Sequence, residues 1–358
     1  MIYLNNAATT QQKPEGVKNA QPADPQQAKA QAARLFGMKN PENIILTHSG
    51  RQAVELALRT FLEEGDHVIV SVMDQDETWN VIEHMAAVNG ITFSVLGAGT
   101  YGALNYDEID ELVRPNTRAI ICAHGCSVTG NLADMERLCT IARRHKLLVI
   151  SDGCQAVGAV DVKLEDLGID VYCFTAHKKL MGPYGIGGIC IREGLMDQFR
   201  SGLPRALEQN PALAEILEPF DEKVLGGFCR AVDFIFEKGI YGISIFPHRL
   251  AKRFFESVKS MDAVEVYGDF GTNTRIPTVA ISVKGFTPHQ VKEHMSKKFG
   301  IVVKDGLQDA SRMHEALGTE ETGLTRFSFG YFNTRRDVND AVWALMDLLG
   351  LDDLYLLA

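Results

Sequence analysis

Two adjacent lysines within residues 175–188, TAHKKLMGPYGIGG, are the side chains best suited to covalent chemistry. They follow a short apolar run at 170–174 and precede another at 188–192, so the segment is predicted to link two buried strands. A lysine at a strand end can serve as a nucleophile and proton carrier. The glycines after it suit a loop whose backbone approaches a bound phosphate closely. We interpret Lys178 as the reactive amine, with Lys179 as the alternative.

An acid and an amide form a second group in the string ISDGCQAVG at 150–158. Asp152 ends an apolar run, where a carboxylate is costly unless it has a cationic partner. The protonated pyridine nitrogen of pyridoxal phosphate (PLP) would be such a partner, and its charge makes the ring an electron sink. Gln155 could hydrogen-bond the hydroxyl of the same ring. The alternative is that Asp152 caps the following turn.

Donors for a phosphate occur on both sides of this group. Thr175 and His177 flank the lysine, and the string THSGRQ at 47–52 predicts a strand–turn–helix junction. Free backbone amides at such a helix start, here those of Gly50 and Arg51, point at bound anions. Capping of the helix by a hydroxyl of the turn is the alternative. Together these residues predict a PLP site in which a lysine carries the cofactor as a Schiff base.

The elements that must position these residues alternate between strand and helix. Near-continuous apolar strands with helices between them predict an α/β fold, with a largely parallel sheet covered on both faces. Ligands of such sheets bind outside the carboxyl ends of the strands, the edge where Asp152 and Lys178 are expected. Strands are predicted at 44–46, 67–72, 91–96, 119–123, 147–151, 170–174 and 188–192, and helices at 53–62, 78–88 and 133–145.

The pattern changes in the last third of the chain. Long helices are predicted at 224–237 and 243–261, followed by an α+β block with strands at 264–267, 278–283, 301–303 and 324–329. We therefore expect an N-terminal segment at 1–14, a large cofactor-binding domain at 15–240 and a small C-terminal domain at 241–358.

Composition narrows the classes of partner. The chain has 358 residues, 46% of them hydrophobic and 23% charged, as in ordinary globular proteins. A net charge of −10 argues against nucleic acid and against an anionic membrane surface. No apolar run is long enough for a membrane span, and the first residues do not resemble a signal peptide, so a cytoplasmic protein is expected. The seven cysteines include no CxxC pair, and no metal site is expected.

Six strings, in this order, resemble class V aminotransferase-like PLP enzymes, specifically the cysteine desulfurase and selenocysteine lyase group. They cover roughly residues 1–350 and read YLNNAATT, GDHVIVS, AHGCSVTG, ISDGCQAVG, TAHKKLMGPYGIGG and TRFSFGYFNT. The resemblance implies a type I PLP-enzyme fold and a homodimer with the site at the subunit interface. It also implies a small amino acid as substrate. The resemblance also suggests a sulfur-acceptor protein as a partner, which the sequence does not test.

The resemblance also implies roles for individual residues. Arg326 matches the arginine that grips the substrate carboxylate, a role that suits the planar guanidinium. Asn6 and Ala7, in the N-terminal turn, are expected beside the substrate. The expected cofactor-binding residues are Gly50, Arg51, Gln75, Asp152, Gln155, Thr175, His177 and Lys178.

The sequence departs from the desulfurase pattern in the small domain. Desulfurases of this family carry a mobile cysteine that accepts sulfur as a persulfide, and Asp309 occupies the matching position, after Gln308. A carboxylate cannot accept a sulfur atom, and no cysteine follows Cys229. In the large domain, Gln75 or Asp76 falls where the family places a ring-stacking histidine.

Two functions of different classes remain open. The first is a PLP enzyme that uses Lys178 for β-elimination at a C–S or C–Se bond, for transamination or for racemisation, without a persulfide step. The second is a catalytically weak PLP-binding homologue that serves as a partner or regulatory subunit. A nucleotide loop at 182–188 is disfavoured, because its glycines do not fit the G-x-G-x-x-G spacing.

Overall fold

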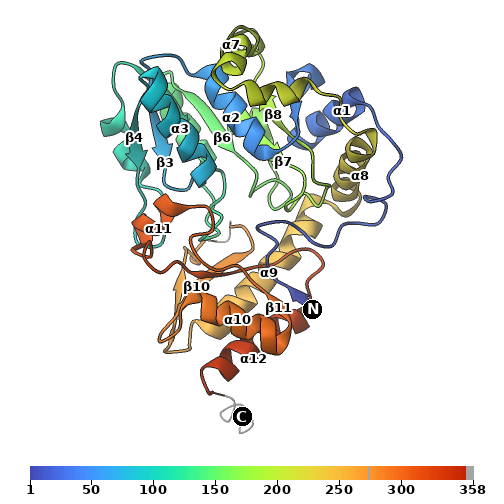
Figure 1. The fold of residues 1–358 in the computed structure, drawn as a ribbon, viewed down its shortest axis with the longest axis vertical. Coiled ribbons are helices and arrows are strands. Elements are labelled where there is room, and N and C mark those ends of the chain that lie inside the picture. The colour runs from blue at the N-terminus through green and yellow to red at the C-terminus, as the bar shows by residue number, and fades with distance from the viewer. Residues whose placement is uncertain (273–274, 352–358) are drawn as a thin grey trace.

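A seven-stranded sheet forms the centre of the larger lobe (Figure 1). The computed structural model describes residues 1–272 and 275–351. Neighbouring strands are parallel except at β8, which is antiparallel to both β7 and β2. In spatial order the strands are β2 (Ile44–Thr47), β8 (Gly187–Ile191), β7 (Val171–Thr175), β6 (Leu148–Asp152), β5 (Thr117–Ile121), β3 (His67–Ser71) and β4 (Thr92–Leu96).

The largely parallel α/β sheet predicted from the sequence is confirmed, with β8 as the exception. β7 and β8 are joined by the short segment 176–186 without a helix, and so short a connection can join only antiparallel neighbours. As a result β2, β6 and β7 end at one edge of the sheet, and β8 begins there.

Helices cover both faces of this sheet. One apolar core lies between the sheet and α1 (Pro25–Phe36), α5 (Met135–Arg144) and α8 (Glu222–Lys238). A second core lies on the opposite face, against α2 (Gly50–Phe61), α3 (Asp76–Asn89) and α7 (Met196–Gln209). Two one-turn helices, α4 (Ile109–Leu112) and α6 (Leu164–Leu167), lie in connections.

The smaller lobe has its own core around an antiparallel sheet with the strand order β12-β10-β9. A short parallel pair, β1 with β11, adds the N-terminus of the chain to this lobe. Its elements are β1 (Ile2–Tyr3), β9 (Val264–Tyr267), β10 (Thr278–Val283), α10 (Pro288–Phe299), β11 (Ile301–Val302), α11 (Ser311–Leu317), β12 (Thr325–Ser328) and α12 (Arg335–Leu348).

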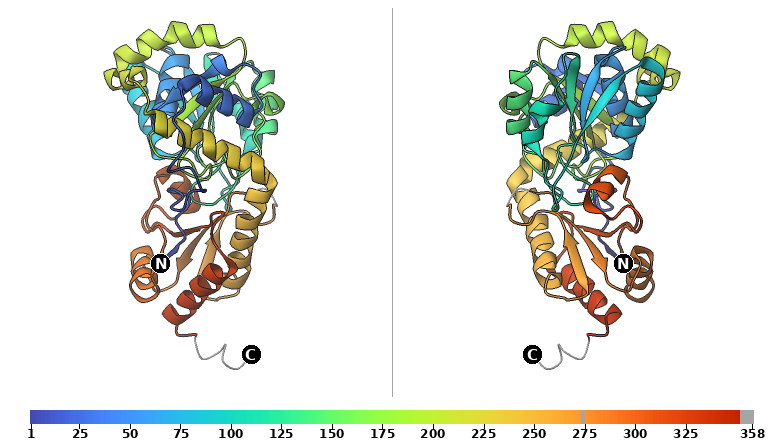
Figure 2. Two further views of the ribbon diagram at one scale, coloured as in Figure 1. Left: turned by 90° about the vertical axis from the view of Figure 1, so that its right-hand side faces the viewer. Right: turned by 90° about the vertical axis from the view of Figure 1, so that its left-hand side faces the viewer.

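Three segments connect the lobes. Helix α9 (Ile240–Val258) runs from the larger lobe into the smaller one (Figure 2), and α11 lies beneath α3 (Figure 1). The N-terminal chain passes from β1 to the segment after β7, where Thr10 Oγ1 donates a hydrogen bond of 2.7 Å to the Lys178 carbonyl. The domain boundary predicted near residue 240 stays a prediction; α8 ends at Lys238 and α9 begins at Ile240. The last seven residues of the predicted small domain lie outside the described part of the chain.

Candidate active site

A cavity of about 330 Å³ opens at the edge of the sheet where β2, β6 and β7 end. It is lined from both lobes and from the N-terminal segment. Ten of the residues predicted from the sequence line it, namely Ala7, Gly50, Arg51, Gln75, Asp152, Gln155, Thr175, His177, Lys178 and Arg326.

The start of α2 packs closely against the end of β7. Ser49 caps this helix by accepting a hydrogen bond from the Gln52 amide. A Cβ atom added to Gly50 would lie 2.5 Å from Cys154 Sγ and 3.0 Å from Thr175 Cβ. Glycine is therefore required for the helix start to reach the strand ends. The positive end of the helix dipole thus faces the cavity, as an anion site requires.

Two buried polar atoms beside this helix start lack partners. Thr175 Oγ1 and His177 Nδ1 have no hydrogen-bond partner among the described residues, and both residues line the cavity. Burial lowers the pKa of His177 to about 4, with the charges of Lys178 and Lys13 adding to the shift. Its neutral ring stacks on Tyr184, with the ring centroids 4.4 Å apart. Beside the start of α2, these two atoms are placed to bind the oxygen atoms of a phosphate.

Arg51 lies at the opening of the cavity, beside the start of α2. Its side chain is 68% exposed and forms an ion pair of 3.2 Å with Glu77, a cavity residue that the sequence did not single out. The backbone amide of Arg51 lies in the first turn of α2, and its guanidinium group borders the opening.

The two adjacent lysines differ in their surroundings. Lys178 lines the cavity. Lys179 does not, is only 6% exposed, and its Nζ donates a hydrogen bond of 2.8 Å to Gln155 Oε1. Of the two lysines that line the cavity, Lys178 and Lys304, Lys178 is the one at the strand ends.

The acid and the amide predicted to contact a cofactor ring lie together at the end of β6. Asp152 is 8% exposed, and its Oδ1 accepts a hydrogen bond of 2.8 Å from the Cys154 amide. Asp152 therefore does cap the following turn, as the alternative interpretation held, while it also lines the cavity. Gln155 Nε2 donates to the Ala7 carbonyl at 3.0 Å, which ties this wall to the N-terminal segment.

Arg326 lies across the cavity on β12. Its side chain donates to the Ser127 carbonyl at 3.0 Å and to Asn5 Oδ1 at 3.2 Å. Burial lowers the pKa of Arg326 to about 10, so the guanidinium group remains charged at neutral pH. Because both hydrogen-bond partners are neutral, the guanidinium group keeps its positive charge and further N–H donors for a carboxylate.

Asn6 lies behind the cavity wall, in contrast to its expected place beside the substrate. Its Nδ2 donates to the Ser328 carbonyl at 2.9 Å and to Asn333 Oδ1 at 3.0 Å. Asn5 lines the cavity instead. The extended chain explains this: alternate residues Leu4 and Asn6 are buried in the small lobe, so Asn5 faces the opposite way. Alternation along 2–6 was the signal that sequence reasoning missed.

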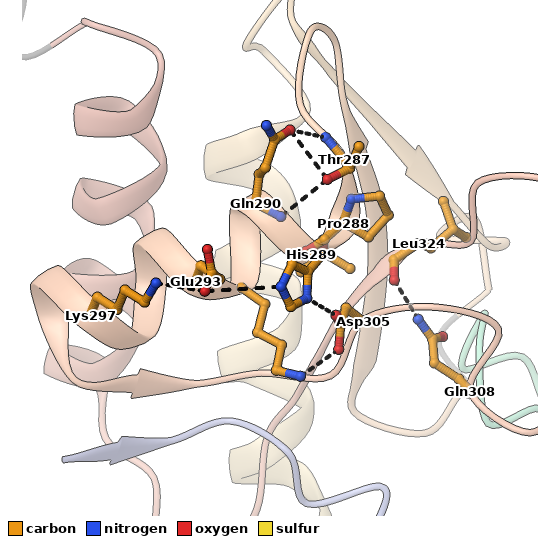
Figure 3. Close-up of polar contacts among 11 residues, drawn as sticks. Thr287, Pro288, His289, Gln290, Glu293, Lys297, Asp305, Gln308 and Leu324 are labelled. Atoms are coloured by element: carbon orange, nitrogen blue, oxygen red, sulfur yellow. Dashed lines mark hydrogen bonds and ion pairs between the residues drawn. The ribbon is translucent and has the colours of Figure 1, made fainter.

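The third wall is a loop of the small lobe that contributes Lys304, Gln308 and Asp309. Gln308 and Asp309 adopt left-handed backbone conformations, with φ of 55° and 58°. Asp305, in this loop, pairs with His289 of α10 (Figure 3). It also accepts a hydrogen bond of 2.7 Å from Lys292 Nζ of the same helix.

Two further contacts hold the far end of this loop. Gln308 Nε2 donates to the Leu324 carbonyl at 2.6 Å (Figure 3). Asp76, at the start of α3, accepts hydrogen bonds from the Ser311 amide at 2.8 Å and from Ser311 Oγ at 3.1 Å. Its own amide donates to the Asp309 carbonyl at 3.0 Å. Asp76 is thus a link between the lobes rather than a cavity residue.

The described residues offer neither a metal site nor a membrane span. No group of three or more histidine, cysteine, aspartate or glutamate side chains there could hold a metal ion. Within the same residues, no helix has the length and apolar character needed to cross a bilayer.

The chain is similar to known proteins over most of its length. A family model described as aminotransferase class V matches residues 23–340. A probable cysteine desulfurase of Halalkalibacterium halodurans is 23% identical over 336 residues, which cover 87% of this chain and 79% of the relative. A probable cysteine desulfurase of Staphylococcus epidermidis is 24% identical over 334 residues, covering 89% and 79%.

Solved structures share the fold. The apo cysteine desulfurase of Thermococcus onnurineus NA1 superposes with a TM-score of 0.86 at 21% identity, covering 98% of this chain and 94% of that one. The cysteine desulfurase CsdA of Escherichia coli gives a TM-score of 0.81 at 20% identity, with the same coverage. Because the family model spans most of the chain and its members depend on PLP, the predicted cofactor is confirmed at the level of the family. The chain belongs to the class V aminotransferase family of PLP-dependent proteins.

Proposed function

We propose that this protein is a PLP-dependent enzyme that acts on a small amino acid, with C–S or C–Se lyase or aminotransferase chemistry and no persulfide step. The observation that carries the proposal is that Lys178, Asp152 and Arg326 line one cavity together with the unpaired donors beside α2. When bound, PLP supplies an electron-accepting ring that stabilises negative charge at the substrate Cα.

Each role in the proposal follows from the position of the residue. Thr175 Oγ1, His177 Nδ1 and the first amides of α2 bind the phosphate. Asp152 keeps the ring nitrogen protonated. Arg326 holds the substrate carboxylate and so orients the Cα–H bond, and Lys178 Nζ takes the proton from that carbon.

A persulfide step is not part of the proposal, for a reason that lies in the cavity. Its lining includes one cysteine, Cys154, which is 4% exposed. Burial raises the pKa of Cys154 well above its usual value, and the charge of Asp152 adds to the shift. The thiol form that results is a poor nucleophile. Asp309, in the position of the family's sulfur acceptor, has no sulfur.

The experiment is to incubate the purified protein, loaded with PLP, with cysteine, cystine, selenocysteine and alanine, and to measure sulfide, selenide and pyruvate. We expect turnover of at least one of these substrates and its loss in Lys178→Ala. Lys252→Ala, which removes an exposed lysine of α9, is the matched control and should turn over normally. PLP binding without turnover of any amino acid would favour the partner-subunit alternative instead. Equal turnover by Lys178→Ala would refute the proposal.

We further propose that the protein is a homodimer. Exposed apolar side chains follow one another along the first turns of α9, where Tyr241 is 70%, Ile245 44% and Phe246 37% exposed. Such an exposed apolar stripe is typical of a surface that another protein chain covers. Light scattering during gel filtration should give twice the chain mass, and a monomer at micromolar concentration would contradict the proposal.

A further inference from the structure

The buried lysine next to Lys178 has no place in the chemistry described above. Lys179 is 6% exposed and is not one of the residues that line the main cavity. It borders a separate cavity of about 20 Å³, together with Thr10, Ser244 and Tyr331. Room for about one water molecule is all that this second cavity offers.

A charged side chain at this position is costly to bury. Burial lowers the pKa of Lys179 well below its usual value, and the nearby cations Lys178 and Arg326 add to the shift. Among the ion pairs of the described residues, none joins Lys179 to a carboxylate. A methionine would fill the same volume without this cost, so space filling alone does not account for the amine.

What the amine does is orient Gln155. Lys179 Nζ donates to Gln155 Oε1 at 2.8 Å, and Gln155 Nε2 donates to the Ala7 carbonyl at 3.0 Å. Turning the amide over would set its NH₂ group against the amine and its oxygen against the Ala7 carbonyl. Both contacts therefore select one orientation. The second N–H of Nε2 then remains for the main cavity, which Gln155 lines.

We propose that Lys179 is a positioning residue for the cofactor: it fixes the Gln155 amide so that Gln155 presents an N–H donor, and not its oxygen, to the ring hydroxyl of PLP. A donor at that point stabilises the ionised hydroxyl oxygen, which shares a proton with the nitrogen of the Lys178 Schiff base. The inference rests on the proposed function, because it needs PLP in the main cavity.

The test is a pH titration of the visible absorbance of the PLP-loaded protein. In Lys179→Met the amide keeps only its contact with the Ala7 carbonyl and turns over more readily. The ionised oxygen then loses its donor for part of the time, and the shared proton is held more tightly. The midpoint of the titration should rise by about 0.5–1 pH unit, the size expected for one neutral hydrogen bond. Gln155→Leu should shift it in the same direction, and the double variant should shift it no further than Gln155→Leu alone. Lys179→Arg, which keeps a donor, should titrate like the wild type.

The outcomes distinguish a failure of the inference about Lys179 from a failure of the proposed function on which it rests. A wild-type protein with no visible band refutes the proposed PLP site, before Lys179 is in question. A wild-type band with an unshifted midpoint in Lys179→Met overturns the role of Lys179 alone. If Lys179→Met does not fold, as judged by circular dichroism, Lys179→Leu, which also lacks a donor, takes its place. The midpoint must then rise in Lys179→Leu, and an unshifted midpoint there also overturns the inference.

Discussion

The two walls of the cavity differ in how they are held. On the large-lobe wall, the buried and unpaired atoms Thr175 Oγ1 and His177 Nδ1 lie beside the start of α2. The small-lobe wall also has buried and unpaired atoms, Gln308 Oε1 and Arg326 Nε. Its loop from Lys304 to Ser311 is held at both ends, by the contacts of Asp305 with α10 and by Asp76 of α3. Both walls therefore have polar groups left for a ligand, and the loop has a shape that does not depend on one.

This difference bears on the chemistry. An arm that delivers a reactive cysteine has to move, whereas contacts to two separate helices oppose movement of this loop. We infer that the loop is a fixed wall that shapes the substrate side of the cavity. The left-handed conformations of Gln308 and Asp309 support this, because backbone strain of this kind persists only where the surroundings enforce it.

The largest effect is expected from the large-lobe wall. Asp152→Ala should lower kcat by about 10²–10³-fold, the usual loss when one preorganised electrostatic contact is removed. The visible band of the cofactor should shift as well, because the ring nitrogen loses its charged partner. Asp161→Ala, an acid outside the cavity lining, is the control. A kcat within a factor of two of the wild type would mean that Asp152 only caps its turn.

Arg326→Lys should act mainly on substrate binding. A lysine cannot reproduce the two-point contact with a carboxylate, so KM should rise about 10–100-fold, as expected for a lost charged hydrogen bond. Steady-state kinetics with the best substrate measure this. An unchanged KM would place the carboxylate elsewhere in the cavity.

Asp76→Ala tests the fixed loop directly. Loss of its contacts with Ser311 should increase amide hydrogen exchange across 305–311 by about tenfold, which corresponds to about 1.4 kcal/mol of local stability. Asp107→Ala removes an exposed acid of another ion pair and should leave that exchange unchanged. If exchange in the loop is already fast in the wild type, the contrast between the two walls fails.

The last effect, on stability and not on activity, concerns Asp74, which lies just beyond β3. It is fully buried and accepts hydrogen bonds from Ser71 Oγ at 2.6 Å and from the Ala123 amide at 3.0 Å. Burial raises the pKa of Asp74 to about 7, and the charge of Asp152 adds to the shift. The folded protein then holds a proton that the unfolded chain releases near pH 4. Stability should therefore fall as the pH rises from about 4 to 7.

Asp74→Asn removes this titration. The free energy of unfolding of the variant, relative to the wild type, should increase by about 3 kcal/mol between pH 4.5 and pH 8. Urea unfolding at pH 4.5 and pH 8 measures the difference. A difference that is constant with pH would show that Asp74 is ionised throughout.

Sequence patterns predicted the large lobe well, because buried parallel strands are continuous apolar runs. The strands β3, β5, β6, β7 and β8 all lie within two residues of their expected positions. The direction of β8 could not be predicted, since an apolar run carries no sign of its pairing. Helices α7, α10, α11 and α12 were not predicted. Most of their length is amphipathic surface that carries no motif.

The site was predicted in part. Motif residues at strand ends could be found, because the carboxyl ends of parallel strands lie at the same edge of the sheet, where ligands bind. Contacts between distant segments could not, and these include Asn5 beside Arg326 and Asp76 beside Ser311. Tertiary packing also decides that Lys178 lines the cavity and Lys179 does not. The sequence alone therefore could not choose between the two lysines.

The central claim is that Lys178, and not its neighbour, carries the cofactor. The most direct measurement is borohydride reduction of the PLP-loaded protein, followed by proteolysis and mass spectrometry of the peptide that contains 175–188. The account predicts a phosphopyridoxyl group on Lys178 and an unmodified Lys179. Modification of Lys179, or of neither lysine, would contradict it.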